Sequence, residues 1–361
     1  MDADTTALSP SGLLRFQELR SEAINTVTER FYRNNAADYA HFGQRGREAC
    51  REDLAFHLEF LRPVLEFGLV QPMVDYLRWL ASVLATRDIP SGHLSLSLSW
   101  LSEFFAAKMD RADAQIVSAA LKQIAMSFLQ QDHAEPAIYG MMPAAWPESA
   151  LFEKALLAGD RKSADALLTA CLAQGRGLLD AELHVIQPAL YSIGHKWQNN
   201  LVTVVQEHLA TAIAQSVMNH GLLQSQIPAS NGQRVVLACV EGNNHAVGLQ
   251  MVADAFQLAG WDVQFLGANV PTRSLLAHLD QSKPDLLGLS VSFAQQFRVV
   301  KAVMAGLMQS PNGSRLPVII GGLAINQFNR LADKLGADGW SPDARSAVSN
   351  AALLAAPQAA G

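Results

Sequence analysis

The segment GNNHAVG, residues 242–248, places a single imidazole where a strand should pass into a helix. It follows the apolar run VVLACV, typical of a buried strand, and precedes LQMVADAFQLAG, whose apolar spacing predicts a helix. A neutral imidazole such as that of His245 is a good ligand for a first-row transition metal such as cobalt or iron. Its second ring nitrogen then needs a neighbouring oxygen, which Asn243 or a backbone carbonyl can supply.

Three further loops carry small or polar residues at the same predicted sheet edge. Ser290 and Ser292 follow the third predicted strand, Gly321 and Gly322 follow the fourth, and GANVP at 267–271 follows the second. Ligands bind open α/β sheets at the carboxyl ends of the strands, where neighbouring loops diverge. We expect the adjacent glycines to leave a slot that admits a long flat group, and the two hydroxyls to bond to its polar edge.

A second group of candidate residues precedes this region. In GHKWQNNLVTVVQEHLAT, Trp197 is followed after nine residues by Glu207 and His208. A large ring near the end of one helix, with a carboxylate and an imidazole early in the next, can overhang the face of a flat cofactor. The alternative is that Trp197 fills the core, as most aromatic side chains do, and that Glu207 is a solvated charge.

The elements that must position these residues fall into three predicted domains and a linker. Residues 1–135 show helical spacing, and we expect five to seven helices there. Residues 136–149 hold three prolines and a glycine, which predicts a linker. Residues 150–225 predict a small helical bundle, whose last helix opens at TVVQ, 203–206, with the spacing of a capping box. Residues 234–356 alternate strand-like and helical segments, which predicts an α/β domain with a parallel sheet.

Composition limits the classes of function. The 27 basic and 33 acidic residues give a formal charge of −6 and form no basic stripe, which disfavours direct nucleic-acid binding. No secretory signal is visible and no apolar run approaches the roughly 20 residues that span a bilayer, so we expect a cytoplasmic protein without membrane contact. The cysteines Cys50, Cys171 and Cys239 lack metal-ligand spacing and are interpreted as buried thiols.

The loop residues resemble a known signature. The pattern of cobalamin-binding domains, Asp-x-His-x-x-Gly with Ser-x-Leu and Gly-Gly, is similar to the residues of three loops here: Asn243, His245, Gly248, Ser290, Ser292, Gly321 and Gly322. The resemblance covers about residues 234–350. It implies a flavodoxin-like fold, with His245 as the lower axial ligand of cobalt and the dimethylbenzimidazole tail in the slot. Asn243 replaces the aspartate, which predicts a less electron-rich histidine ligand, and Ser292 replaces the leucine.

The Trp-x9-Glu-His pattern resembles that of the adenosylcobalamin-dependent photoreceptors. The resemblance implies a bundle that caps the upper face of the cofactor, with Trp197 beside the adenosyl group and Glu207 and His208 close to it. Loss of that group on illumination would change interdomain or quaternary packing in a homo-oligomer that signals to an unidentified protein. In the light-responsive repressors of this class a histidine beside the tryptophan takes the vacated position. Gln198 stands there in this chain, and His195 and His208 are the alternatives.

Those repressors begin with a winged-helix DNA-binding domain, whose hairpin and basic helix residues 1–131 do not show. An all-helical, globin-like domain joined to a capped cobalamin module instead resembles the photocobilins, which implies biliverdin as a second chromophore. Arg45 and Arg47 can pair with its propionates, and Tyr39 or His57 can bond to its pyrrole nitrogens or carbonyls. The alternative is that these residues belong to the core and to solvated faces.

Two other functions fit the same residues. A corrinoid protein that carries methyl groups between methyltransferases would prefer methylcobalamin and tolerate Trp197→Ala, although that class does not carry the Trp-x9-Glu-His pattern. A haem-binding redox sensor would use His245 as its iron ligand. The Trp-x9-Glu-His pattern favours a non-enzymatic light sensor over both.

Overall fold

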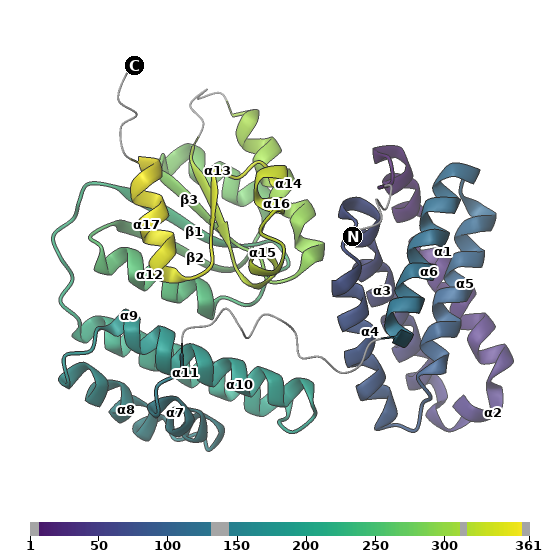
Figure 1. The fold of residues 1–361 in the computed structure, drawn as a ribbon, viewed down its shortest axis with the longest axis horizontal. Helices are drawn as coiled ribbons and strands as arrows, with labels where there is room; N and C mark the ends of the chain where they lie inside the picture. Colours follow the sequence, from purple (N-terminus) through teal and green to yellow (C-terminus); the bar gives the residue numbers. More distant parts are fainter. Residues whose placement is uncertain (1–6, 131–143, 311–315, 356–361) are drawn as a thin grey trace. The chain divides into compact units, whose positions relative to one another are not determined.

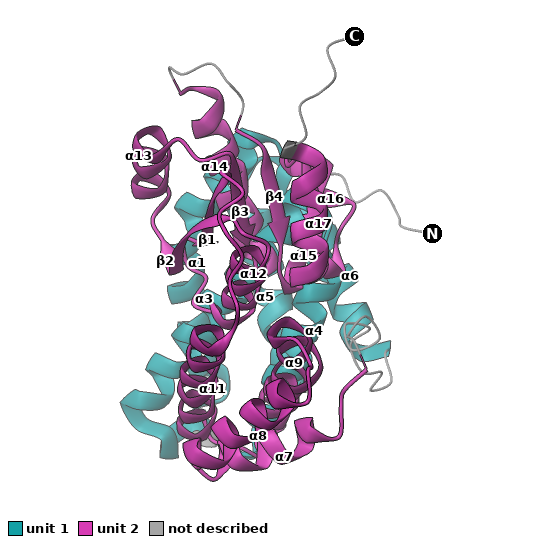
Figure 2. Cartoon of the chain, turned by 90° about the vertical axis from the view of Figure 1, so that its left-hand side faces the viewer, with its two compact units in different colours: residues 1–134 teal, residues 135–361 magenta. Residues whose placement is uncertain are grey.

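The computed structural model describes residues 7–130, 144–310 and 316–355 and divides the chain into two compact units, residues 1–134 and 135–361 (Figure 1, Figure 2). The first unit is helical, and the second joins a helical bundle to an α/β fold. Most of the predicted linker lies outside the described residues. Within the described ranges, no helix combines the length and the apolar character that crossing a membrane requires.

The first unit is all-helical, as predicted; the globin-like detail stays a prediction. Its helices are α1 (Pro10–Asn34), α2 (Ala36–Tyr39), η1 (Ala40–Phe42), α3 (Gly43–Phe67), α4 (Val70–Ala85), α5 (Gly92–Lys108) and α6 (Arg111–Gln130). Pro10 opens α1, and the Ser9 hydroxyl caps it by accepting from the N–H of Gly12 at 3.0 Å. The core includes Phe16 stacked on Phe105, with ring centroids 5.0 Å apart.

The bundle of the second unit contains a π-helical turn. Its elements are α7 (Glu148–Leu157), α8 (Arg161–Ala173), α9 (Leu178–Ala181), the π-turn η3 (Glu182–Ile186), α10 (Gln187–Gln198) and α11 (Val204–Gln224). Pro188 offers no N–H to the carbonyl of His184 four residues earlier, and the N–H of Trp146 donates to that carbonyl at 2.9 Å. The predicted capping box of α11 is confirmed. Thr203 accepts from the Gln206 N–H at 3.3 Å, and the Gln206 side chain accepts from the Thr203 N–H at 3.0 Å.

The α/β fold contains one parallel sheet. Its strands are β1 (Arg234–Val240), β2 (Asp262–Val270), β3 (Leu286–Ser290), β4 (Val318–Gly321) and β5 (Gly339–Ser341), in the order β2-β1-β3-β4-β5. Its helices are α12 (Val247–Leu258), α13 (Thr272–Ser282), η4 (Ala294–Gln296), α14 (Phe297–Met308), α15 (Leu323–Gln327), α16 (Leu331–Leu335) and α17 (Ala344–Ala355). Helices α12 and α17 pack together, and α13 packs on α14 (Figure 1). The strand order is that of flavodoxin-like folds.

The bundle and the α/β fold meet at a seam inside the second unit. Met251 and Ala255 of α12 and Ala344 of α17 belong to the same buried apolar cluster as the bundle helices. Glu182 of η3 and Asp254 of α12 are buried carboxyl groups at this seam. Burial raises the pKa of Asp254 to about 6, and burial together with the Asp254 charge raises the pKa of Glu182 well above its usual range. Both shifts favour the protonated, uncharged form of these carboxyl groups over two buried negative charges.

Candidate functional site

The predicted site lies at the carboxyl edge of the sheet, where the strand order reverses between β1 and β3. Register brings the loops together, because Cys239 of β1 pairs with Ser290 of β3 and Ser290 pairs with Gly321 of β4. Helix α12 begins two residues after His245, so Gly248 lies in its first turn. The loops that follow β1, β3 and β4 therefore start side by side.

Side chains and backbone groups from other loops hold the loop that precedes His245. Gly242 has φ +82°, and its N–H donates to the Oδ1 of Asn269 at 2.7 Å. The Asn269 N–H donates back to the Asn243 carbonyl at 2.8 Å, and the Asn243 N–H donates to the Val240 carbonyl at 2.9 Å. The backbone from which the imidazole projects is thus fixed before any ligand binds.

Asn243 serves this backbone and not the imidazole. Its side chain is fully buried, its Nδ2 donates to the Ser290 carbonyl at 2.9 Å, and its Oδ1 accepts from the His245 N–H at 3.1 Å. Within the described residues, neither ring nitrogen of His245 has a hydrogen-bond partner. The Asn243 side chain, or a backbone carbonyl, was expected to accept a hydrogen bond from the second ring nitrogen of His245. In the structure the Asn243 side chain instead joins the loops that follow β1 and β3.

His245 is an exposed residue whose imidazole lies beside an aromatic ring. The Phe293 ring lies 5.1 Å from it, at an interplanar angle of 77°. Partial desolvation lowers the pKa of His245, and the charge of Glu207 on the bundle opposes this shift. A lowered pKa favours the neutral imidazole, which is the form that binds a metal. Because the charge of Glu207 acts on His245, helix α11 of the bundle and the carboxyl edge of the sheet border the same space.

Neighbouring backbone leaves little room for a side chain at the two glycines that end and follow β4. A Cβ on Gly322, whose φ is +97°, would lie 2.6 Å from the Val291 carbonyl oxygen, and one on Gly321 would lie 3.0 Å from that of Ser341. The close approach of three loops explains both residues. The tail slot that they were expected to line stays a prediction.

Of the predicted serine pair, Ser290 is buried and Ser292 is half-buried. The Ser292 N–H donates to the Oε1 of Gln296 at 3.0 Å. Gln296 was not predicted as a site residue, and its bond to the Gly242 carbonyl spans 54 residues and has no local pattern. GANVP was predicted as the loop after the second strand, but Gly267–Val270 form the end of β2 itself, where the register with β1 is irregular. The bonds of Asn269 were not predicted.

The tip of the α10–α11 hairpin presents an unusually apolar surface. Trp197 is 37% exposed, and four aliphatic residues beside it in sequence are more exposed still: Leu201, Val204, Val205 and Leu209. Glu207 accepts from the Thr211 hydroxyl at 3.0 Å and lies 2.6 Å from the Nδ1 of His208. Contiguous exposed apolar side chains mark binding surfaces more often than ordinary protein surface.

The residues expected to bind a bilin have separate neighbours in the first unit. The Tyr39 hydroxyl lies 2.6 Å from the Nδ1 of His93. Arg47 forms an ion pair with Glu29, and Arg45 is exposed. A bilin contact by these residues therefore stays a prediction.

His57 lies inside the helical core. It is 1% exposed, and its Nδ1 lies 3.0 Å from the Tyr76 hydroxyl and 2.6 Å from the Asp53 carbonyl. Burial lowers its pKa to about 4, so the ring is neutral at physiological pH. These contacts support the core alternative for His57.

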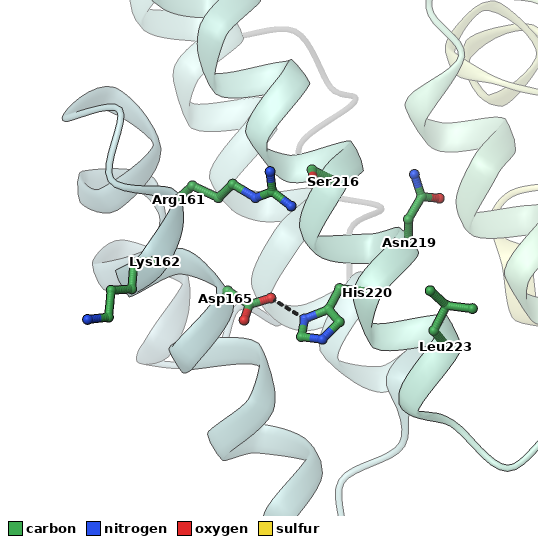
Figure 3. Close-up of a pocket in the computed structure, with 7 residues that line it drawn as sticks. All are labelled: Arg161, Lys162, Asp165, Ser216, Asn219, His220 and Leu223. Atoms are coloured by element: carbon green, nitrogen blue, oxygen red, sulfur yellow. Dashed lines mark hydrogen bonds and ion pairs between the residues drawn. The ribbon is translucent and has the colours of Figure 1, made fainter.

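A pocket of about 600 Å³ lies between α8 and α11, and none of the predicted site residues lines it. Figure 3 shows its lining residues, among which Asp165 and His220 are hydrogen-bonded at 2.6 Å. They are Arg161, Lys162, Asp165, Ser216, Asn219, His220 and Leu223. The pocket is therefore distinct from the site around His245.

Two regions of the second unit match known families. Residues 233–349 match a family described as a B12 binding domain, and residues 150–220 match a second family of the same description. The matched regions cover the α/β fold and most of the bundle.

Individual relatives fall into two groups. The chain is 31% identical over 122 residues to Dimethylamine corrinoid protein 3 of Methanosarcina mazei, covering 34% of this chain and 72% of that protein. It is 30% identical over 136 residues to Dimethylamine corrinoid protein 3 of Methanosarcina acetivorans, covering 37% of this chain and 63% of that protein. It is 26% identical over 258 residues to the HTH-type transcriptional repressor CarH of Myxococcus xanthus, covering 70% of this chain and 84% of that protein. The chain thus spans less than two thirds of the Methanosarcina acetivorans protein.

Proposed function

The chain belongs to the family of cobalamin-binding proteins with a B12 binding domain, and we propose that it holds a corrinoid between the bundle and the α/β fold. The observation that carries this proposal is the His245 imidazole, which is free of hydrogen bonds within the described residues and has a lowered pKa. A neutral imidazole on a fixed loop, at the sheet edge between β1 and β3, has the properties expected of a lower axial ligand to cobalt.

The bundle supplies groups for the opposite face of the corrinoid. Trp197 and the exposed aliphatic residues of the α10–α11 tip would cover its apolar surface. Glu207, whose charge reaches His245, stands with His208 on the same side. The two serines and the two glycines after β3 and β4 would line the path of the nucleotide tail.

The cofactor form we propose is adenosylcobalamin, and the role is that of a light sensor. The bound cofactor supplies a weak cobalt–carbon bond, while the chain provides ligation, orientation and exclusion of water. Trp197 would rest on the adenosyl group in the dark. Loss of that support would shift the α10–α11 tip and change packing within the second unit or between copies of the chain. In the first unit, a bilin such as biliverdin is proposed as a second chromophore.

A corrinoid carrier of methyl groups is the second candidate function. It is favoured by the identity to the dimethylamine corrinoid proteins, which reaches 31%. The Trp197 and Glu207-His208 pattern favours the sensor, because a methyl carrier must expose its upper face to a partner enzyme and has no use for a fixed ring there.

One experiment separates the two functions. The protein is loaded with adenosylcobalamin or methylcobalamin in the dark, and its absorption spectrum and oligomeric state are recorded before and after green light. The sensor role predicts that the adenosyl form changes its spectrum and assembly together, and that Trp197→Ala uncouples them. An unchanged spectrum together with an unchanged oligomeric state in the wild type would leave the methyl carrier as the better account.

A further inference from the structure

We propose that Gln296 is a positioning residue that ties the His245 loop to the loop after β3 and so determines where the imidazole stands. The inference rests on the proposed corrinoid site. Gln296 is the last residue of η4 and is only 5% exposed. Its amide makes three hydrogen bonds, and all three partners are backbone groups.

The three bonds join two loops that are distant along the chain. The Nε2 of Gln296 donates to the Gly242 carbonyl at 3.0 Å, on the loop that carries His245. The Oε1 accepts from the N–H of Ser292 at 3.0 Å and from that of Phe293 at 3.2 Å, on the loop after β3. One loop presents an acceptor and the other presents donors. A side-chain amide satisfies both, whereas a carboxylate satisfies only the donors.

Both ends of this bridge reach the surroundings of the imidazole. The Gly242 N–H is already held by Asn269, so Gln296 completes the fixation of a glycine that has φ +82° and would otherwise allow the loop to swing. Phe293, whose N–H is held by the same amide, packs edge-on against the His245 ring. Gln296 therefore fixes both the backbone that carries the ring and the side chain against which it rests.

A metal-ligating side chain that is already held in place loses less conformational entropy when it coordinates the metal. Loss of the Nε2 donor leaves the Gly242 carbonyl without this bond and frees the loop. From the usual contribution of one buried hydrogen bond, corrinoid affinity should fall roughly tenfold.

The test uses the full chain with hydroxocobalamin as the probe. Gln296→Glu keeps the length and the acceptor, replaces the donor by an oxygen and adds a negative charge at a buried position. Gln309→Glu makes the same chemical change at the exposed far end of α14 and serves as the control. We measure the Kd, the fraction of cofactor with histidine coordinated from the absorption spectrum, and amide hydrogen exchange of residues 241–247 in the unliganded protein.

We expect Q296E to bind roughly tenfold more weakly, to hold less histidine-coordinated cofactor and to exchange faster over 241–247, with Q309E like the wild type. A Q296E protein that matches the wild type in affinity, spectrum and exchange would overturn the positioning role. If Q296E does not fold, Gln296→Met, of similar size and without charge, takes its place with the same expectations. Failure of the wild type to bind any corrinoid would overturn the proposed function itself, and the positioning role with it.

Discussion

Exchanging the amide of Asn243 for a carboxylate is the sharpest perturbation of the site. The resemblance to cobalamin-binding domains places an aspartate at this position, yet the side chain here donates to the Ser290 carbonyl at 2.9 Å while accepting from the His245 N–H at 3.1 Å. Asn243→Asp keeps the acceptor and replaces the donor by an oxygen that repels the Ser290 carbonyl.

The size of the effect follows from burial. Asn243 is 0% exposed, so no solvent compensates the lost bond. Leaving a buried group unsatisfied costs about 1–3 kcal/mol, and desolvation of the carboxylate adds to this cost. For a unit of 150–250 residues, 1 kcal/mol lowers the Tm by about 2–4 °C, so we expect the second unit to unfold about 2–12 °C lower in N243D.

The assay is thermal unfolding of the unliganded protein, followed by circular dichroism and by calorimetry to separate the two units. Asn244→Asp is the matched control, because this neighbour is exposed and its side chain makes no hydrogen bond within the described residues. N244D should leave the Tm within about 1 °C of the wild type, since exposed substitutions cost little. Equal Tm values for N243D and N244D would refute the assigned role of Asn243.

Two further predictions concern the second unit. Glu182→Gln removes one of two buried carboxyl groups. Burial raises the folded-state pKa of both, and of Asp254 to about 6 although its contact with Glu182 lowers it; Asp254 raises the pKa of Glu182 further. The free energy of unfolding of the wild type should therefore fall as the pH rises from about 4 through 6. At pH 8 the variant should be about 1–3 kcal/mol more stable than the wild type, and its stability should depend less on pH. The same difference in unfolding free energy between the two proteins at pH 5 and at pH 8 would contradict this. Gly322→Ala adds a Cβ 2.6 Å from the Val291 oxygen at φ +97°, whereas Gly232→Ala, at φ +84°, meets nothing within 4 Å. Urea unfolding should give a cost of about 1–2 kcal/mol for G232A and at least about 3 kcal/mol for G322A, and equal costs would remove the close-packing explanation.

The sequence predicted those features that repeat or stand next to each other along the chain. The alternation of strand-like and helical segments gave the parallel sheet, and the spacing in 203–206 gave the capping box. The strand Gly339–Ser341 escaped prediction because three residues are too few for a period to show.

Pairings over long sequence distances could not be predicted. Gln296 meets a carbonyl 54 residues earlier, and no local pattern encodes that bond. Asn243 or a backbone carbonyl was expected to face the His245 ring, whereas in the fold the Asn243 Nδ2 donates to the Ser290 carbonyl, 47 residues later. The residue types of 242–248 thus identified the loop that carries His245, but not the residues distant along the chain that bond to it.

The proposed coordination of cobalt by His245 is tested most directly by electron paramagnetic resonance of the full chain loaded with cob(II)alamin, after all histidines have been labelled with ¹⁵N. Coordination by a labelled imidazole predicts that each cobalt line splits into a doublet, and that the His245→Ala protein shows no such doublet. A triplet unchanged by the label, which the ¹⁴N of the cofactor's own dimethylbenzimidazole would give, contradicts the claim.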